Sequence, residues 1–300
     1  MKILIIGSKG FIGSHAFSFF NSLDYNVFGC DVVVDYNDPK YFQVDASNSD
    51  FTEIFRKTEF NICINCSGAA SVPDSMQRPQ RDFQLNVVNV AKLLETIRNY
   101  SPLCKFLNLS SAAVYGNPPM LPINESAPMQ PISPYGLHKE MAEQLCAEYH
   151  DYFNINTCNL RIFSAYGPGL KKQLFWDLYQ KSKSNIHLEL FGTGEETRDF
   201  IFIDDIIIAI DIVVRVGEFN GEVLNLASGR EVRISDAVKL FFEALKWDGT
   251  YSFQGEGREG DPKRWCADIS ELKNLGFEVK YELKTGLIKY IEWLPAEERK

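Results

Sequence analysis

Lys2-Ile3-Leu4-Ile5-Ile6 runs directly into Gly7-Ser8-Lys9-Gly10-Phe11-Ile12-Gly13, and this segment is the clearest sign of the fold class. The apolar run predicts a buried strand, and the glycines after it predict a tight turn into a helix. Glycines let the backbone approach a pyrophosphate, whose charge the N-terminus of a helix attracts. The spacing is GxxGxxG rather than GxGxxG, and a tight strand-to-helix turn also needs glycine. The order of strand, turn and helix nevertheless favours a dinucleotide site.

Short apolar strands alternate with helices through the first half of the chain. The expected strands are Lys2–Ile6, Tyr25–Asp31, Phe42–Asp45, Asn61–Cys66, Phe106–Ser110 and Thr157–Phe163. The expected helices are Phe11–Leu23, Phe51–Lys57, Asp82–Tyr100 and Tyr135–Phe153. This alternation predicts an α/β fold of the Rossmann type with a doubly wound parallel sheet. Right-handed crossovers then place ligands at the carboxyl ends of the strands.

The alternation becomes less regular after about residue 165. Further helices are expected at Leu174–Ser182, Ile206–Val216, Ser235–Leu245 and Thr285–Trp293. We therefore expect residues 1–165 to form the dinucleotide-binding Rossmann domain and residues 166–300 to form a smaller C-terminal α/β substrate lobe. A segment near 200–227 is expected to return to the main domain, with a strand at Val223–Ala227.

Composition sets limits on partners and location. The 300 residues carry a net charge of −9 with a pI near 5.1, whereas a general nucleic-acid binder would need a basic surface. No nucleic acid is therefore expected as a partner. No membrane segment is expected either, because the apolar stretch Ile206–Val214 is short and is interrupted by Asp211. The N-terminal apolar run ends at Gly7, too early for a signal sequence, so we expect a cytoplasmic location.

Seven cysteines leave at least one unpaired, which suits a reducing compartment. Cys63 and Cys66 form a CxxC pattern inside the expected strand Asn61–Cys66. Residues three apart in a strand point to opposite faces, so these two thiols should not bind one metal ion together. We interpret them as core thiols and expect no metal site.

Asp31 ends the second expected strand, where a carboxylate accepts hydrogen bonds from the adenosine ribose and repels a 2′-phosphate. No Lys or Arg lies between Asp31 and Asp38 to receive such a phosphate. Both features favour NAD over NADP. Lys9 leaves NADP open, because a basic residue in the glycine loop could reach a 2′-phosphate. It could equally be a solvated loop lysine.

Tyr135 and Lys139 lie four residues apart, a spacing that puts both side chains on one face of a helix. An ammonium beside a phenol favours the phenolate, so Lys139 is expected to lower the pKa of Tyr135 from about 10. Tyr135 then becomes a candidate acid/base near neutral pH. This spacing is common by chance, and the pair gains weight from Ser110-Ser111 upstream and from the glycine loop.

In this order the motifs resemble those of the extended short-chain dehydrogenase/reductase family, in particular its nucleotide-sugar epimerase/dehydratase group. The resemblance covers nearly the whole chain. Its markers are the glycine loop 7–13, Asp31, Val44-Asp45, Ser110 through Gly116 (SSAAVYG), Tyr135 with Lys139, Arg161 through Pro168 (RIFSAYGP), Arg198 through Asp205 (RDFIFIDD) and Arg258-Glu259-Gly260-Asp261.

The resemblance implies a catalytic group made of Ser111, Tyr135 and Lys139. Tyr135 would be the acid/base, and Lys139 would lower its pKa and bind the nicotinamide ribose of NAD. Ser111 would hydrogen-bond the reacting sugar oxygen. Its neighbour Ser110 is the weaker candidate for that role and could simply cap backbone groups at the end of the strand.

The resemblance also implies binding residues. Those for the cofactor would be Gly7, Gly10, Phe11, Ile12, Gly13, Asp31, Asp45 and Ala69, together with Tyr135 and Lys139. Those for a nucleoside-diphosphate sugar would be Asn86, Ser164, Arg198 and Arg258, with the arginines on the two phosphates. Asn86 could instead be a packing residue, and each arginine could instead form a surface salt bridge. Phe175 and Leu178 lie where the substrate helix of the family begins and could equally be packing residues.

Departures from the family pattern narrow the chemistry. The 4,6-dehydratases of the family carry Thr-Asp-Glu where this chain has Ser111-Ala112-Ala113. Alanine cannot protonate a leaving hydroxyl, so dehydration is not expected. The related sugar-acid decarboxylases need a glutamate at the position of Ala113, so decarboxylation is not expected either. Ser164 replaces a common asparagine near the diphosphate.

The leading hypothesis is an NAD-dependent nucleotide-sugar epimerase acting at C4 through a transient 4-keto intermediate. The alternative is a 4-keto nucleotide-sugar reductase that uses NADH or NADPH, which phosphate binding by Lys9 would favour. A third reading, a non-catalytic dinucleotide-binding protein, ranks low because Ser111, Tyr135 and Lys139 are all present.

A homodimer is expected from the resemblance. The expected helices Asp82–Tyr100 and Tyr135–Phe153 correspond to the pair that forms a four-helix dimer interface in the family. The apolar residues available for it on the first helix are Leu85, Val88, Leu93 and Ile97. These side chains could equally face the chain's own sheet.

Overall fold

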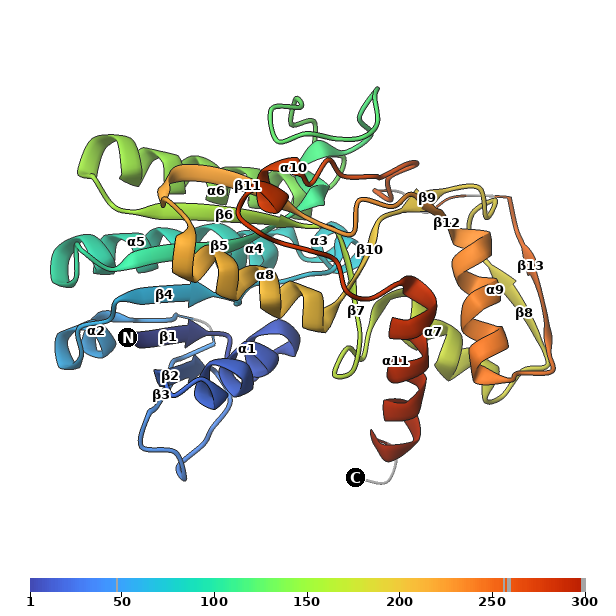
Figure 1. Cartoon of the computed structure of the whole chain (residues 1–300), viewed down its shortest axis with the longest axis horizontal. Coiled ribbons are helices and arrows are strands. Elements are labelled where there is room, and N and C mark those ends of the chain that lie inside the picture. The colour runs from blue at the N-terminus through green and yellow to red at the C-terminus, as the bar shows by residue number, and fades with distance from the viewer. Residues whose placement is uncertain (47, 256, 258–259, 298–300) are drawn as a thin grey trace.

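The computed structural model describes residues 1–46, 48–255, 257 and 260–297, and at its centre lies a parallel sheet of seven strands (Figure 1). The strands lie in the order β3 (Tyr41–Gln43), β2 (Asn26–Asp31), β1 (Lys2–Ile6), β4 (Ile62–Asn65), β5 (Lys105–Ser111), β6 (Thr157–Ile162) and β11 (Asn220–Leu226). Every neighbouring pair is parallel. The strand order reverses between β1 and β4, as in a doubly wound sheet. The Rossmann-type fold predicted from the alternation is confirmed.

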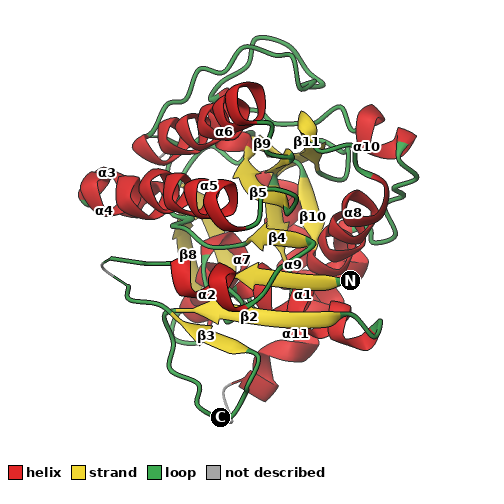
Figure 2. Cartoon of the chain, turned by 90° about the vertical axis from the view of Figure 1, so that its left-hand side faces the viewer, coloured by secondary structure: helices red, strands yellow, loops and turns green. Residues whose placement is uncertain are grey.

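Helices cover both faces of this sheet (Figure 2). One face carries α1 (Phe11–Ser22) and α8 (Ile203–Val216), and the other carries α2 (Thr52–Lys57), α5 (Asn89–Tyr100) and α6 (Pro134–Phe153). Successive side chains of a strand point to opposite faces. Ile3 and Ile5 therefore pack with α1 and α8, and Leu4 and Ile6 pack with α2, α5 and α6. A strand buried on both faces needs the unbroken apolar run that opens the chain.

Three buried asparagines, Asn65, Asn108 and Asn159, form a row across the middle of the sheet. Asn65 Nδ2 donates to Asn108 Oδ1 at 3.0 Å, and Asn108 Nδ2 donates to Asn159 Oδ1 at 2.9 Å. The three residues are direct cross-strand partners on β4, β5 and β6. Because these hydrogen bonds need that register, the asparagine row aligns the carboxyl ends of the three strands.

The second half of the chain adds one strand to this sheet and builds a smaller lobe beside the carboxyl ends of its strands (Figure 1). The strand expected near 223–227 is β11, which pairs with β6. The lobe contains the strand pairs β7 (Ser164–Tyr166) with β10 (Phe200–Phe202), β8 (His187–Leu190) with β13 (Thr250–Phe253), and β9 (Thr197–Arg198) with β12 (Val232–Arg233). The helices of this half, besides α8, are α7 (Gln173–Ser182), α9 (Ile234–Leu245), α10 (Ser270–Asn274) and α11 (Leu283–Glu297). The domain boundary at residue 165 stays a prediction.

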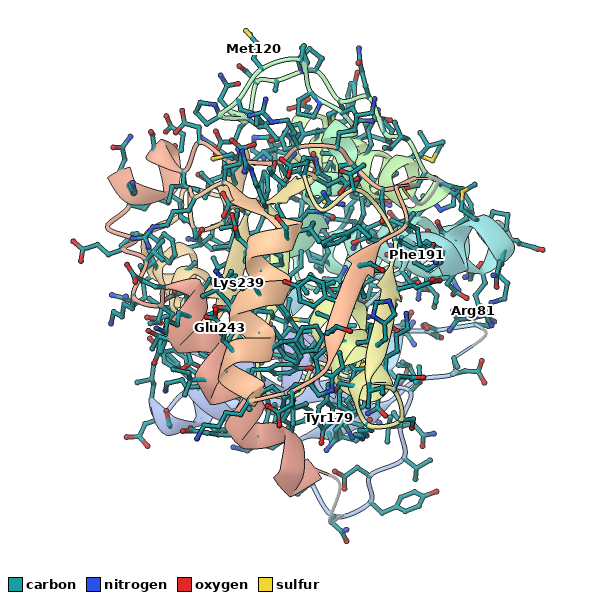
Figure 3. All side chains as sticks on the ribbon, turned by 90° about the vertical axis from the view of Figure 1, so that its right-hand side faces the viewer. Arg81, Met120, Tyr179, Phe191, Lys239 and Glu243 are labelled. Carbon is teal, nitrogen blue, oxygen red and sulfur yellow. The ribbon has the colours of Figure 1, made fainter. Side chains whose placement is uncertain are left out.

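The smaller lobe has an aromatic core between α7 and α9. Phe175 of α7 packs on Phe241 of α9 with ring centroids 5.6 Å apart, and Leu178 is buried in the same core. Phe175 and Leu178 are thus packing residues. The opposite face of α9 is polar: Figure 3 shows Lys239 and Glu243 on its outer side, where Nζ and Oε1 lie 3.9 Å apart.

The single helix expected at Asp82–Tyr100 is interrupted. A short helix, α4 (Pro79–Phe83), leads into a π-helical segment at Gln84–Val88, and α5 follows. The π-helical turn is wider than an α-helical turn and is frequent at functional sites. It contains Asn86. The helix before it, α3 (Val72–Gln77), had no prediction.

Cys63 and Cys66 behave as core thiols. Cys63 is buried in the core beneath α2, α5 and α6, and Cys66 is partly buried against the core on the other face, as the strand period predicts. All seven cysteines are free. Within the described part of the chain, no helix has the length and apolar character needed to cross a membrane, and no cluster of His, Cys, Asp and Glu is arranged to hold a metal ion.

Candidate active site

The glycine loop forms a tight turn between β1 and α1. Gly7 has a φ of +79°, a conformation that favours glycine, and its N–H donates to Cys30 O at 2.7 Å. A methyl group on Gly13 would lie 2.0 Å from Gly7 O, so only glycine lets the helix pack on the loop. Gly10 precedes the first residues of α1, Phe11 and Ile12, and provides no side-chain cap. The first N–H groups of α1 therefore remain available to an anion.

Asp31 lies at the carboxyl end of β2, beside this loop. Its carboxylate accepts hydrogen bonds from the backbone N–H groups of Lys9 at 2.9 Å and Val32 at 2.7 Å. Each carboxylate oxygen keeps a lone pair for a ribose hydroxyl. The structure places Asp45 near the same edge, because Val44 N–H donates to Asp31 O at 3.0 Å. Asp45 therefore follows directly on the residue that pairs with Asp31, and its role in cofactor binding stays a prediction.

Lys9, whose role the sequence left open, is held by an acidic side chain. Its Nζ forms a salt bridge of 2.6 Å with Asp35 and lies 4.9 Å from the centroid of the Tyr41 ring. The hydrogen bond from Lys9 is the main cause that lowers the pKa of Asp35. A 2′-phosphate at this edge would approach the carboxylates of both Asp31 and Asp35. The geometry thus favours a dinucleotide without that phosphate.

The loop 67–70 closes the site from the side of β4. A methyl group on Gly7 would lie 2.8 Å from Ser67 N, so the two loops are in close contact. Ala69 is partly buried in this loop, and Gly68 has a φ of +116°. A methyl group on Gly68 would lie 2.4 Å from Asn86 Oδ1, so only glycine leaves room for the amide oxygen here.

Asn86 is 1% exposed, yet its side chain is only half satisfied. Its Nδ2 donates to Asp82 Oδ1 at 3.0 Å, whereas its Oδ1 has no hydrogen-bond partner among the described residues. A buried acceptor without a partner beside a glycine cradle is suited to a ligand that brings hydroxyl donors. Asn86 was expected to bind the nucleotide sugar, but it lies against the loop 67–70 that is predicted to contact the cofactor, so its acceptor fits the dinucleotide instead.

The catalytic helix α6 is fixed at its first turn. Ser133 caps it, with Oγ accepting the Gly136 N–H at 3.1 Å, and Tyr135 N–H donates to Ser75 Oγ of α3 at 3.1 Å. A methyl group on Gly136 would lie 2.5 Å from Ala113 O. Glycine thus lets the start of α6 lie directly against the turn that follows β5.

Ser111, Tyr135 and Lys139 meet at the carboxyl end of β5. The Ser111 side chain lies next to that of Tyr135 and acts to lower the pKa of the phenol. Lys139 Nζ donates to Leu109 O at 2.9 Å and lies 6.0 Å from the centroid of the Tyr135 ring. The structure therefore brings together the three residues predicted to be catalytic.

The predicted effect of Lys139 on the pKa of Tyr135 is wrong for this geometry. Burial raises the pKa of Tyr135 to about 12, while Ser111 acts in the opposite direction and Asp82 adds to the rise. Burial also lowers the pKa of Lys139 to about 8, against the effects of Asp82 and Glu143. An ammonium 6.0 Å from the ring centroid does not offset the loss of water around the phenol.

The predicted substrate residues of the second lobe are partly assembled. Arg198 on β9 is partly buried, its NH1 donates to Thr197 O at 2.9 Å, and burial lowers its pKa. Most of its donors have no partner among the described residues. Ser164 lies beside it, since Ser164 N–H donates to Asp199 O at 3.0 Å. Arg258 lies outside the described residues.

Two residues near the catalytic group had no prediction. Asp82 on α4 and His138 on α6 are buried, with His138 Nδ1 2.7 Å from Asp82 Oδ1. A histidine directly before Lys139 was the available signal, because a buried imidazole needs a polar partner.

Fold and site together define a Rossmann-type protein with a dinucleotide cradle and a second lobe beside the carboxyl ends of the strands. Residues 3–227 match the model of the family described as NAD dependent epimerase/dehydratase family, and the chain belongs to that family. The resemblance inferred from the motifs is confirmed.

The relatives of this chain include epimerases and a dehydratase. A putative UDP-glucose 4-epimerase of Methanocaldococcus jannaschii is 28% identical over 99% of both chains. A dTDP-D-glucose 4,6-dehydratase of Dictyostelium discoideum is 32% identical over 79% of this chain and 61% of its own length. A UDP-glucuronic acid 4-epimerase from Bacillus cereus, solved with UDP-glucuronic acid and NAD, has a TM-score of 0.90 and 26% identity, covering 99% of this chain and all of that one.

Proposed function

We propose that the protein is an NAD-dependent nucleotide-sugar epimerase that inverts C4 through a transient 4-keto intermediate. The observation that carries the proposal is the meeting of Ser111, Tyr135 and Lys139 at the carboxyl end of β5, next to the glycine loops that fit a dinucleotide. Two relatives that match over nearly their full length are described as 4-epimerases, which supports this choice. The substrate is a nucleoside-diphosphate sugar.

Tyr135 exchanges a proton with the 4-hydroxyl of the sugar, and Ser111 holds the same oxygen. NAD, when bound, supplies the acceptor and then the donor of the C4 hydrogen. Tyr135 takes the hydroxyl proton as C4 is oxidised and returns it as C4 is reduced, so the cycle consumes no proton. Because the pKa of Tyr135 is about 12 in this geometry, the phenolate needs the Lys139 ammonium to approach more closely.

Ala112 and Ala113 favour an epimerase over a dehydratase. They form the turn directly after Ser111, and both are buried. A methyl side chain can neither protonate a leaving hydroxyl nor remove a proton from carbon. We therefore propose that the sugar keeps its 6-hydroxyl, although a 4,6-dehydratase is among the relatives.

Arg198 supports a diphosphate in the second lobe. Its guanidinium is partly buried 5.6 Å from the centroid of the Trp265 ring, and most of its donors have no partner among the residues that the structure describes. Planar guanidinium groups match phosphate oxygens in pairs. Arg258 is proposed as the second phosphate ligand and Ser164 as a neighbour of the diphosphate.

The test is incubation of the purified protein with a panel of nucleotide sugars that carry deuterium at C4, without added cofactor. An epimerase yields both C4 configurations with the deuterium retained at C4. A 4-keto reductase would need added NADH or NADPH, and a dehydratase would release water. Identifying the dinucleotide released on denaturation distinguishes NAD from NADP.

Tyr135→Phe is the matched catalytic test. Turnover should fall at least about 100-fold, because the proton-transfer group is lost, whereas binding of the nucleotide sugar should persist. Tyr152→Phe is the control, since Tyr152 lies on the same helix and is 77% exposed. Unchanged turnover in Tyr135→Phe would refute the proposed chemistry.

We also propose a homodimer built on the segment from Asp82 to Tyr100, which includes α5, and on α6. Leu93 and Ile97 do not support it, because both are fully buried in the chain's own core. Leu85 and Val88 are partly exposed and remain available. Light scattering tests the proposal, and a monomer at micromolar concentration would refute it.

A cytoplasmic location is proposed on the seven free cysteines, which suit a reducing compartment. Cell fractionation tests it. Recovery from an oxidising compartment would contradict it.

A further inference from the structure

A buried histidine–aspartate pair lies against the catalytic group and has no part in the proton transfer described above. Asp82 is 1% exposed and His138 is 8% exposed. His138 Nδ1 lies 2.7 Å from Asp82 Oδ1, and the ring of Phe83 meets the imidazole edge-on at 5.4 Å. Since His138 directly precedes Lys139, the pair ties α4 to the catalytic turn of α6.

The same oxygen of Asp82 fixes the carboxamide of Asn86. Asn86 Nδ2 donates to Asp82 Oδ1 at 3.0 Å. Because the carboxylate oxygen accepts this bond, the amide NH2 faces Asp82 and the amide oxygen faces away. That oxygen points toward Gly68, where a methyl group would lie 2.4 Å from Asn86 Oδ1 and 3.6 Å from Lys139 Nζ.

Asp82 also places a negative charge near the Lys139 ammonium. Burial lowers the pKa of Lys139 to about 8, and four groups act against that effect. In decreasing order they are Asp82, Glu143, Cys146 and Cys66. Glu143 is already paired with Arg161 at 2.7 Å, whereas Asp82 Oδ2 is buried with no hydrogen-bond partner in the described part of the chain. Of the two carboxylates, Asp82 is therefore the one whose charge is not already paired with an arginine.

We propose that Asp82, held by His138, is a positioning residue: it turns the amide oxygen of Asn86 toward Gly68, in the loop next to Lys139, and places a negative charge near the ammonium. The inference rests on the proposed function for the reaction served. Its two consequences, an oriented acceptor in the cofactor cradle and a charged Lys139, can both be measured without a sugar. A failure of the inference is thus distinguishable from a failure of the epimerase assignment.

The charge is tested with Asp82→Asn, which keeps the shape and one acceptor oxygen but removes the negative charge. The readout is the pH at which Lys139 becomes reactive toward an amine-specific reagent, followed by mass spectrometry of its peptide. We expect the onset of reactivity to move to lower pH, because the neutral amine is favoured once the charge is gone. An unchanged onset would overturn the proposal.

The orientation is tested with Asp82→Leu, which removes the acceptor for Asn86 Nδ2 as well as the charge. NAD binding to the full chain, measured by calorimetry, should weaken about two- to tenfold in Asp82→Leu, as for one lost hydrogen bond. Asp82→Asn should stay closer to the wild type, because its amide oxygen can still accept. Equal affinity in Asp82→Leu and the wild type would refute the positioning role.

His138 and a distant aspartate provide the controls. Asparagine at position 138 can place Nδ2 where His138 has Nδ1, so His138→Asn should retain NAD affinity that His138→Leu loses. Asp211→Asn removes a buried aspartate of α8, paired with Arg215 at 2.9 Å, and should change neither readout. Equal loss in both His138 variants, or an equal change in Asp211→Asn, would refute the role of the pair. Melting curves show which variants are folded, and Asp82→Asn alone decides the charge if leucine is not tolerated.

Discussion

Replacing Glu143 with leucine is expected to destabilise the protein strongly. Glu143 lies on α6 one turn after Lys139 and is 5% exposed. It accepts hydrogen bonds from Arg161 Nε at 3.0 and 3.1 Å, from Arg161 NH2 at 2.7 Å and from Ser110 Oγ. Arg161 on β6 is 4% exposed. Leucine would leave a buried guanidinium without its counter-charge.

The magnitude follows from what remains around Arg161. Removing one partner of a buried ion pair costs about 3–5 kcal/mol. The lower end applies, because Arg161 NH1 keeps the Tyr115 hydroxyl at 2.7 Å and the Glu125 carbonyl at 2.9 Å. Ser110 loses its acceptor, which adds about 1 kcal/mol. A total of about 4 kcal/mol corresponds to a melting temperature roughly 8 °C lower for a chain of this size.

The assay is denaturant unfolding of Glu143→Leu, Arg161→Met and the double variant. The double variant should be less destabilised than the sum of the two singles by at least about 2 kcal/mol, because it leaves no unpaired charge. Glu148→Leu, an exposed position on the same helix, should change the unfolding free energy by less than about 0.5 kcal/mol. A loss below about 1 kcal/mol in Glu143→Leu, or additive single effects, would refute the reasoning.

Three further results are expected. Turnover should fall as the pH rises through about 8, because burial lowers the pKa of Lys139 and its ammonium is lost there; a profile of kcat that stays flat well above this pH would contradict the role of the charge. Asp35→Asn should raise the affinity for NADP relative to NAD about tenfold in a competition assay, since it releases Lys9 from its salt bridge. An unchanged ratio of the two affinities would show that Lys9 does not face the 2′ position. Gly136→Ala should lower the free energy of unfolding by about 1–3 kcal/mol in a melting experiment, because its methyl group would lie 2.5 Å from Ala113 O. The same variant should turn over more slowly. A variant as stable and active as the wild type would contradict the close packing of α6.

The main sheet could be predicted because its strands are apolar runs bounded by turn residues, as Lys2–Ile6 before Gly7 shows most clearly. Short elements carry too few residues for a period to show. β9 and β12 have two residues each, and they form because the chain on either side brings them together. The π-helical segment at Gln84–Val88 was not predictable either, because its sequence reads as an ordinary amphipathic helix.

The catalytic group could be predicted because Tyr135 and Lys139 are neighbours on one helix. The direction of the pKa shift could not, because the burial that raises the pKa of Tyr135 depends on how other elements pack around it. The pair Asp82–His138 spans 56 positions of sequence, so no local pattern connects its members. Residues that act through long-range contacts need the fold before they can be assigned.

The asparagine row has a consequence for the population of folded molecules. A one-residue slip of a strand turns its apolar side chains to the wrong face, so the core opposes it. A two-residue slip keeps every side chain on its own face and moves the strand by about 6.6 Å, far enough to take Ser111 out of reach of Tyr135. Such a slip would leave Asn65 and Asn108 buried without their partners, at a cost of about 1–3 kcal/mol for each unsatisfied group. The asparagine row thereby disfavours molecules that would be compact and well packed yet inactive.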